Sequence, residues 1–226
     1  MGIRRSVWIW FCEHVLYYPV MINHAVLHRN YTLGQKELRY LVMPQSFYPN
    51  LGERAVEIPY ALEFLRANQK KKVLEVGNVM QGYTQIDVKN HKVIDKYEKG
   101  KNVTNTDIIG LKDVKKYDVV LSISTMEHVG YDEPKKERGK TTSAMIKMAK
   151  ALKPGGIMLI TVPLGYNPEI DDVVKKNKIK FYEMHFMKRV SALNSWAETT
   201  LEDALGRQYG VRWPAACAVA FLIYRA

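Results

Sequence analysis

Apolar and polar positions follow two patterns along the chain, one typical of helices and one typical of buried strands. Residues 52–68 carry apolar side chains at helical spacing, and Pro59 is expected to bend this helix or to start a second one. Val73–Val76 and Tyr117–Ser124 are nearly continuous apolar runs, as in parallel strands covered on both faces. The other elements predicted in this region are a strand at Lys92–Asp95, a helix at Thr142–Leu152 and a strand at Ile157–Val162.

This alternation of strands and helices predicts an α/β domain with a doubly wound, mainly parallel sheet of the Rossmann-like kind. The tail is expected to add strands at Lys178–Met184 and Ala216–Tyr224, with a helix near Ser195–Leu205. We expect these late strands to form an antiparallel edge. Ligands of such sheets bind beyond the carboxyl ends of the strands.

Residues 1–52 read as an N-terminal helical and hairpin extension to a domain at 53–226. Tyr31–Val42 predicts a hairpin with its turn at Gly34-Gln35. Val7–Leu27 is apolar but interrupted by charged and polar residues, so it is a poor membrane-spanning segment and lacks a signal-peptide cleavage site. We expect an amphipathic helix that packs on protein or lies in a membrane interface.

The composition fits one globular domain with extensions, because the 226 residues are 47% hydrophobic and 25% charged. Two distant cysteines, Cys12 and Cys217, provide neither a disulfide framework nor metal-ligand spacing. We therefore expect no metal and a cytoplasmic protein, either free in the cytoplasm or associated with a membrane through the N-terminus. The oligomeric state is unknown from the sequence.

The net charge of +11 is concentrated in the two ends of the chain, with +5 in residues 1–72, −1 in 73–132 and +7 in 133–226. Basic ends suit an anionic membrane, a phosphorylated substrate, nucleic acid or a solvated surface. The lysines are scattered and no RNA-binding motif is present, so nucleic acid is an unlikely partner.

The first motif with chemical meaning is Val73–Gly77, a strand that ends in a glycine turn. Residues 77–82 keep two of the three glycines of the dinucleotide fingerprint, so an NAD-dependent oxidoreductase is one alternative. Asp95 ends the next strand, at a position suited to the ribose hydroxyls of NAD or of S-adenosylmethionine (SAM).

Three later features separate these cofactors. They are Asp107, Glu127-His128 after the fourth strand, and the Leu-Lys-Pro-Gly-Gly turn at 152–156. With 73–77 and 93–95 they resemble, in order and spacing, the motif series of class I SAM-dependent methyltransferases. The last two look most like the ubiquinone/menaquinone-type branch. Leu74–Tyr83, 53–59 and 163–168 also look like uncharacterised methyltransferases of surface-polysaccharide clusters.

One departure from the family pattern concerns the glycine loop, where Val79 and Gln81 replace the second and third glycines. A β-branched valine does not readily adopt a positive φ. The loop then follows a different path, with Asn78 as a candidate for the bending residue, or SAM binding is weakened. A non-catalytic module of this fold, with basic ends that contact RNA or anionic membrane, is therefore a second alternative.

The resemblance implies SAM as cofactor and methyl transfer, most simply to an oxygen of a small or lipid-linked acceptor such as a saccharide. His128 is the candidate base because imidazole exchanges protons near neutral pH, and Glu127 is a second catalytic candidate. Candidate acceptor-binding residues are Arg54, Glu57, Tyr166, Arg189 and Trp196. The candidate cofactor-binding residues are Glu75, Gly77, Asn78, Asp95, Lys96, Asp107, Ile108, Ser124 and Thr125.

Overall fold

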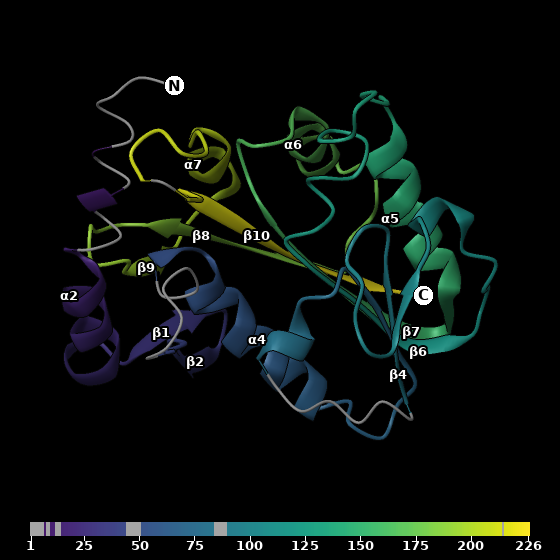
Figure 1. The fold of residues 1–226 in the computed structure, drawn as a ribbon, viewed down its shortest axis with the longest axis horizontal. Coiled ribbons are helices and arrows are strands. Elements are labelled where there is room, and N and C mark those ends of the chain that lie inside the picture. Colours follow the sequence, from purple (N-terminus) through teal and green to yellow (C-terminus); the bar gives the residue numbers. More distant parts are fainter. Residues whose placement is uncertain (1–6, 8–9, 12–14, 44–50, 84–89, 214) are drawn as a thin grey trace. The chain divides into compact units, whose positions relative to one another are not determined.

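The computed structural model describes residues 7, 10–11, 15–43, 51–83, 90–213 and 215–226. Parts of the predicted N-terminal helix, at 8–9 and 12–14, lie outside the described residues. In chain order the elements are α2 (Tyr17–Ile22), the π-helical turn η1 (Asn23–Leu27), β1 (Asn30–Leu33), β2 (Lys36–Arg39), α4 (Arg54–Arg66), β3 (Val73–Val76), the 3₁₀ turn η2 (Met80–Gly82), β4 (His91–Asp95), β5 (Val103–Asn105), the 3₁₀ turn η3 (Ile108–Gly110), β6 (Tyr117–Ile123), α5 (Lys140–Ala151), β7 (Leu152–Pro163), α6 (Pro168–Lys175), β8 (Glu183–Arg189), β9 (Trp196–Glu198), α7 (Leu201–Leu205) and β10 (Ala218–Arg225) (Figure 1).

Eight strands form one sheet in the order β5-β4-β3-β6-β7-β10-β8-β9. The first five run parallel, and their order starts at β3 and extends outward in both directions, as in a doubly wound sheet. β10 runs antiparallel to β7, since Gly155 N donates to Ala226 O and Ala226 N donates to Gly156 O, both at 3.0 Å. The predicted mainly parallel sheet with an antiparallel edge is confirmed.

The chain divides into two compact units. The first comprises residues 1–62, 163–165 and 185–219, and the second comprises 63–162, 166–184 and 220–226. The second unit holds the parallel strands, α5 and α6. The domain division predicted at residue 52 stays a prediction. Among the described residues, no helix combines the length and apolarity needed to cross a bilayer.

In the second unit, the apolar runs of the sequence become the buried strands. All four residues of β3 and six of the seven of β6 are buried, which explains why neither strand alternates in polarity. α5 buries Ala144, Met145 and Met148 on one face. α6 begins at Pro168 with Asn167 as its N-cap, because the Asn167 side chain accepts a hydrogen bond from Glu169 N.

In the first unit, the predicted hairpin is confirmed as β1 and β2, with Leu33 paired to Lys36 across the turn. α4 runs through Pro59 without a break into two helices. Asn194 bonds three separate segments of this unit. Its Nδ2 donates to Gly52 O at 2.9 Å, its Oδ1 accepts from Trp196 Nε1 at 2.9 Å, and its carbonyl lies 3.0 Å from His24 Nε2.

Three elements of the tail differ from the sequence-based expectation. The expected turn at 153–156 is part of β7, because Gly155 and Gly156 pair with the end of the chain. The strand expected at 178–184 occurs later, as β8. The first part of the expected helix near 195–205 is instead β9, which pairs antiparallel with β8, and only the short α7 is helical.

Candidate active site

The turn at Gly77 brings the carboxyl ends of three strands together. Gly77 N donates to Ile94 O of β4 at 2.9 Å, and Gly77 has a φ of +92°, a region that favours glycine. A Cβ on Gly77 would lie 2.1 Å from Oγ1 of Thr125, which follows β6. Both the conformation and the close approach of Thr125 therefore require glycine here.

The loop after Gly77 is organised by Glu75, whose side chain is fully buried. Its Oε1 accepts hydrogen bonds from Val79 N at 2.9 Å and Met80 N at 2.7 Å. Val79 has a φ of −101° and Asn78 has no positive φ, so the loop does not need the missing glycines. Glu75, a cofactor-binding candidate of the sequence analysis, thus orders the turn.

Asp95 links the end of β4 to this loop. Its Oδ2 accepts from Asn78 N at 3.2 Å, and its Oδ1 accepts from Tyr97 N at 2.8 Å and from Glu98 N at 2.7 Å. A carboxylate offers about four acceptor positions, so these three donors leave room for a further one. Asn78 Oδ1 is buried and has no hydrogen-bond partner among the described residues.

Asp107 carries two lysine partners. Its Oδ1 accepts from Ile109 N at 3.0 Å, and Nζ of Lys96 and of Lys140 each lie 3.1 Å from its Oδ2. Burial favours the neutral acid, but the hydrogen bonds from Ile109 and Lys140 lower the pKa of Asp107. Asp107, a cofactor-binding candidate of the sequence analysis, is therefore ionised and is paired with both lysines.

Glu133 completes this charged cluster from the loop between β6 and α5. Its carboxylate lies 2.7 Å from Lys96 Nζ and 2.8 Å from Lys140 Nζ. The hydrogen bond to Glu133 is the main reason why the pKa of Lys96 is raised. A cavity of about 650 Å³ adjoins the cluster. The cavity is lined by Lys96, Tyr97, Glu133, Pro134, Lys135 and Glu137.

The chain turns sharply where β6 ends. Ser124 is buried with a φ of +34°, a strained conformation for a non-glycine residue, and its N–H donates to Thr161 O at 2.8 Å. Thr125 Oγ1 donates to Ile123 O at 3.0 Å, and His128 N donates to Thr125 O at 3.1 Å. These bonds direct the chain from the Gly77 contact straight to His128. Ile108, the remaining cofactor candidate, is buried in η3.

His128 is part of a hydrogen-bonded group of three side chains. Its Nδ1 contacts Oδ2 of Asp132, and the same oxygen accepts a hydrogen bond from the Tyr166 hydroxyl at 2.7 Å. The rings of His128 and Tyr166 meet edge to face, with centroids 5.4 Å apart. Burial, followed by the bond to Asp132, raises the pKa of Tyr166, so this phenol stays protonated. The imidazole is half exposed.

The backbone of the His128 turn is held from α6. Asn167 Nδ2 donates to Glu127 O at 2.9 Å and also contacts Thr141 Oγ1 at 3.2 Å. The Glu127 side chain is buried, with Oε1 3.6 Å from His128 Nε2. Two catalytic candidates of the sequence analysis therefore lie side by side on a turn fixed from the neighbouring helices.

Asp132 and Glu133 were not among the residues singled out from the sequence. An acid four residues after His128 was the available signal, because one turn of chain brings such a pair into contact. No comparable signal marks Glu133, whose partner Lys96 is 37 positions away.

Four of the acceptor-binding candidates lie in the first unit. Arg54 forms an ion pair with Glu57, at 3.3 Å, and the Glu57 side chain is fully buried. Arg189 donates to the carbonyl oxygens of Leu51, Ser191 and Ala192. Trp196 is buried and bonded to Asn194, as described above. The role of these four residues in binding an acceptor stays a prediction.

The strand order bears on the choice between cofactors. The dinucleotide-binding arrangement follows the order 3-2-1-4-5-6 with parallel strands. Here β10 is inserted between β7 and β8 and runs antiparallel to both, since Tyr182 N donates to Ile223 O and Arg189 N donates to Cys217 O. The sheet therefore departs from the dinucleotide-binding order at its sixth position.

Comparison with known proteins gives structural likenesses only. No protein-family model and no curated protein matches the chain. The 1,6-didemethyltoxoflavin-N1-methyltransferase of Burkholderia thailandensis, crystallised with its substrate and S-adenosylhomocysteine (SAH), is 12% identical. The match covers 87% of this chain and 98% of that one, with a TM-score of 0.45.

Two further solved structures reach the same TM-score of 0.45. A SAM-dependent methyltransferase of Archaeoglobus fulgidus is 15% identical, over 75% of this chain and 94% of that one. The [4+2]-cyclase SpnF is 12% identical, over 98% of this chain and 95% of that one. Likenesses this distant do not identify an activity, and one fold supports many.

Proposed function

We propose that this protein is a SAM-dependent methyltransferase that methylates a hydroxyl oxygen of a small or lipid-linked acceptor, such as a saccharide. The observation that carries the proposal is the group formed by His128, Asp132 and Tyr166 directly after the Gly77–Thr125 contact. It combines a candidate proton acceptor with the loop that the sequence resemblance assigns to the cofactor.

The residues at the carboxyl ends of the strands suit such a cofactor. Asp95 retains acceptor capacity for ribose hydroxyls, and the buried Oδ1 of Asn78 is an acceptor for an ammonium group. Asp107 and Ile108 would contact the adenine. Bound there, SAM supplies an electrophilic methyl group on a sulfonium.

His128 would act as the base on the acceptor hydroxyl. With SAM bound, Nε2 of His128 would take the proton of the acceptor hydroxyl as the methyl group passes from the sulfonium sulfur to the hydroxyl oxygen and SAH is released. The Asp132 carboxylate accepts the Nδ1–H and thereby fixes the imidazole tautomer and stabilises the imidazolium that forms. Tyr166 donates to the same carboxylate oxygen and orients it.

Two alternatives make different predictions. The departure of the sheet from the dinucleotide-binding order argues against an NAD-dependent oxidoreductase. A non-catalytic module does not require a carboxylate that fixes the tautomer of His128. The missing glycines suggested a degraded cofactor site, but Glu75 orders the loop without them.

Isothermal titration calorimetry with SAH, SAM and NAD tests the proposal. We expect saturable binding of SAH and SAM and none of NAD. Preference for NAD would overturn the proposal in favour of the oxidoreductase. Absence of binding to all three, together with nucleic-acid binding that weakens steeply with salt, would favour the non-catalytic module.

A further inference from the structure

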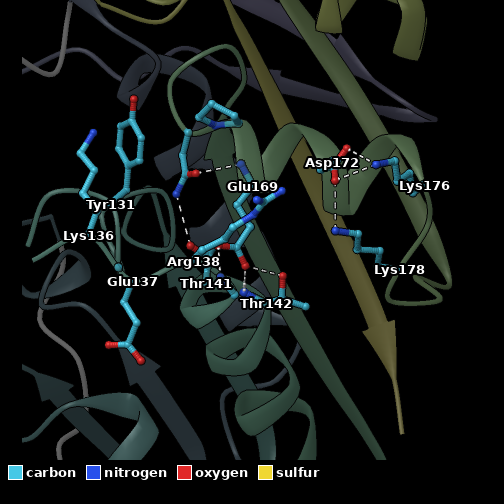
Figure 2. Close-up of a pocket in the computed structure, with 14 residues that line it drawn as sticks. Tyr131, Lys136, Glu137, Arg138, Thr141, Thr142, Glu169, Asp172, Lys176 and Lys178 are labelled. Atoms are coloured by element: carbon cyan, nitrogen blue, oxygen red, sulfur yellow. Dashed lines mark hydrogen bonds and ion pairs between the residues drawn. The ribbon is translucent and has the colours of Figure 1, made fainter.

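A second cavity, of about 660 Å³, lies between the β6–α5 loop, the start of α5 and α6 (Figure 2). In the view of Figure 2, Tyr131 and Lys136 line one side, while Asp172 with Lys176 and Lys178 lines the other. This volume is in the range of sites that bind small molecules.

The carboxylates of this cavity are already engaged. Glu169 accepts from Gly139 N at 2.9 Å and from Thr142 N at 2.8 Å, so it caps the first turn of α5. Asp172 lies 2.8 Å from Lys176 Nζ and 3.1 Å from Lys178 Nζ, so one carboxylate is shared by two ammonium groups. The third carboxylate, Glu137, lies 3.7 Å from Lys140 Nζ, so all three acids pair with groups other than Lys136 and Arg138.

The lining carries four cationic side chains against three carboxylates, and two of the cations, Lys136 and Arg138, form no ion pair among the described residues. Among the described residues, Arg138 has no ion pair or hydrogen bond, and its side chain lies next to Glu169 in the middle of the cavity wall (Figure 2). Lys136 Nζ lies 4.0 Å from the centroid of the Tyr131 ring, a cation–π contact that leaves its ammonium protons available. A guanidinium fork and an ammonium are both suited to phosphate oxygens.

The cavity wall is connected to the His128 turn at two points. Tyr131 N donates to His128 O at 3.1 Å, and the Tyr131 ring lies 5.6 Å from the Tyr166 ring, centroid to centroid. Asn167, also in the wall, bonds to Glu127 O. A ligand in the cavity would thus contact the residues that position the proposed base.

We propose that this cavity binds a phosphate group of the acceptor, with Arg138 as its principal ligand. The inference rests on the proposed function, because it assigns the acceptor to the class of phosphorylated saccharides or lipid-linked phosphates. Phosphate is the chemistry common to both. Its negative charge is complementary to Arg138 and to Lys136, which also lines the cavity and forms no ion pair among the described residues.

The test is a calorimetric titration of the full chain with α-D-glucose 1-phosphate and, separately, with a short-chain polyprenyl phosphate in neutral micelles. Saturable binding of either probe is expected, and the tighter of the two identifies the source of the phosphate. Arg138→Ala should raise the Kd at least about tenfold, because a hydrogen-bonded charge pair is lost. The matched control Arg66→Ala removes an exposed arginine outside the cavity and should leave the Kd unchanged.

Equal affinity of the wild-type protein and Arg138→Ala, or absence of binding of both probes, would overturn the phosphate site. Titration of SAH into the same samples separates this failure from that of the proposed function. Phosphate binding that depends on Arg138 without SAH binding would refute methyl transfer and retain the anion site. SAH binding without phosphate binding would refute the anion site and leave the proposed methyl transfer standing.

Discussion

Oδ2 of Asp132 contacts Nδ1 of His128 and accepts the hydroxyl hydrogen of Tyr166 at 2.7 Å, so one oxygen joins the imidazole to the phenol. Asp132 comes from the same turn as His128, whereas Tyr166 follows β7. This arrangement leaves Nε2 as the imidazole nitrogen that a substrate can reach, and it assigns separate roles to the three side chains.

Replacement of the base should reduce turnover strongly. His128→Ala is expected to lower kcat by roughly 10²- to 10⁴-fold, the usual contribution of a positioned base. The residual rate should rise with pH, as hydroxide replaces the imidazole. The measurement is SAH formation with an acceptor that the wild-type protein methylates. An unchanged kcat would remove His128 from the reaction.

Replacement of Asp132, the partner of His128, should lower kcat less than replacement of His128 itself. Asp132→Ala is expected to lower kcat by roughly tenfold or more, because the imidazole loses its fixed tautomer and a stabilising charge. Tyr166→Phe is the matched comparison, since it removes one donor to Asp132 and keeps the ring packing. It should retain most of the activity. The affinity for SAH should be unchanged in both variants, and a parallel loss of affinity would indicate a structural role only.

Gly77 provides a prediction about the cofactor loop. Gly77→Ala should destabilise the fold by roughly 2 kcal/mol or more and abolish SAH binding, because the positive φ and Thr125 both oppose a Cβ. Gly82→Ala is the control in the same loop, since no atom lies within 4 Å of a Cβ there and its φ is not positive. Urea denaturation and SAH titration measure both effects. Equal behaviour of the two variants would contradict the assigned role of Gly77.

The parallel core of the second unit could be predicted from the sequence because its strands are buried on both faces. β3 and β6 therefore appear as uninterrupted apolar runs, and their relation to the helices follows from chain order. The tail could not be predicted so well. Residues 153–156 have the composition of a turn, and Gly155 has a φ of +76°, yet they belong to β7 as an irregular segment because Gly155 and Gly156 bond to the last residue of the chain.

The sequence predicted the local geometry of the candidate site correctly where the backbone conformation requires one residue type, as at the glycine turn of Gly77. The site was not predictable where the role depends on a distant partner. Asn78 was a candidate for the bending residue of the loop, but Glu75 removes that need by accepting two backbone N–H groups. The partners of Lys96 and Lys140 also come together only in the folded chain.

Asp95 should contribute to cofactor affinity more than to folding. Asp95→Ala is expected to raise the Kd for SAH by roughly 10- to 100-fold, since hydrogen bonds to a charged group are lost. Asp95→Asn keeps one acceptor oxygen for the N–H groups of Tyr97 and Glu98, so it should have an intermediate effect. The midpoint of urea unfolding should change little in Asp95→Asn. Unchanged affinity in both variants would show that the ribose binds elsewhere.

His24 should make the stability of the first unit depend on pH. Burial lowers the pKa of its imidazole to about 4, although the hydrogen bond to Asn194 O opposes this shift. Nδ1 of His24 is buried and has no partner among the described residues, so a second proton on the ring would not be stabilised. The unfolded chain, with its ordinary pKa of 6.5, therefore takes up a proton before the folded protein does.

Because the unfolded chain is protonated first, the free energy of unfolding falls as the pH falls. The contribution of neutral His24 to stability is complete above pH 6.5, is lost as the pH falls from 6.5 to about 4, and is constant below that. A shift of this size corresponds to about 3 kcal/mol. The free energy of unfolding, measured in urea between pH 4 and 7.5, should fall more steeply in the wild-type protein than in His24→Gln. His28→Gln, which replaces an exposed imidazole, should follow the wild-type slope. Parallel slopes for the wild-type protein and His24→Gln would show that His24 does not cause the loss.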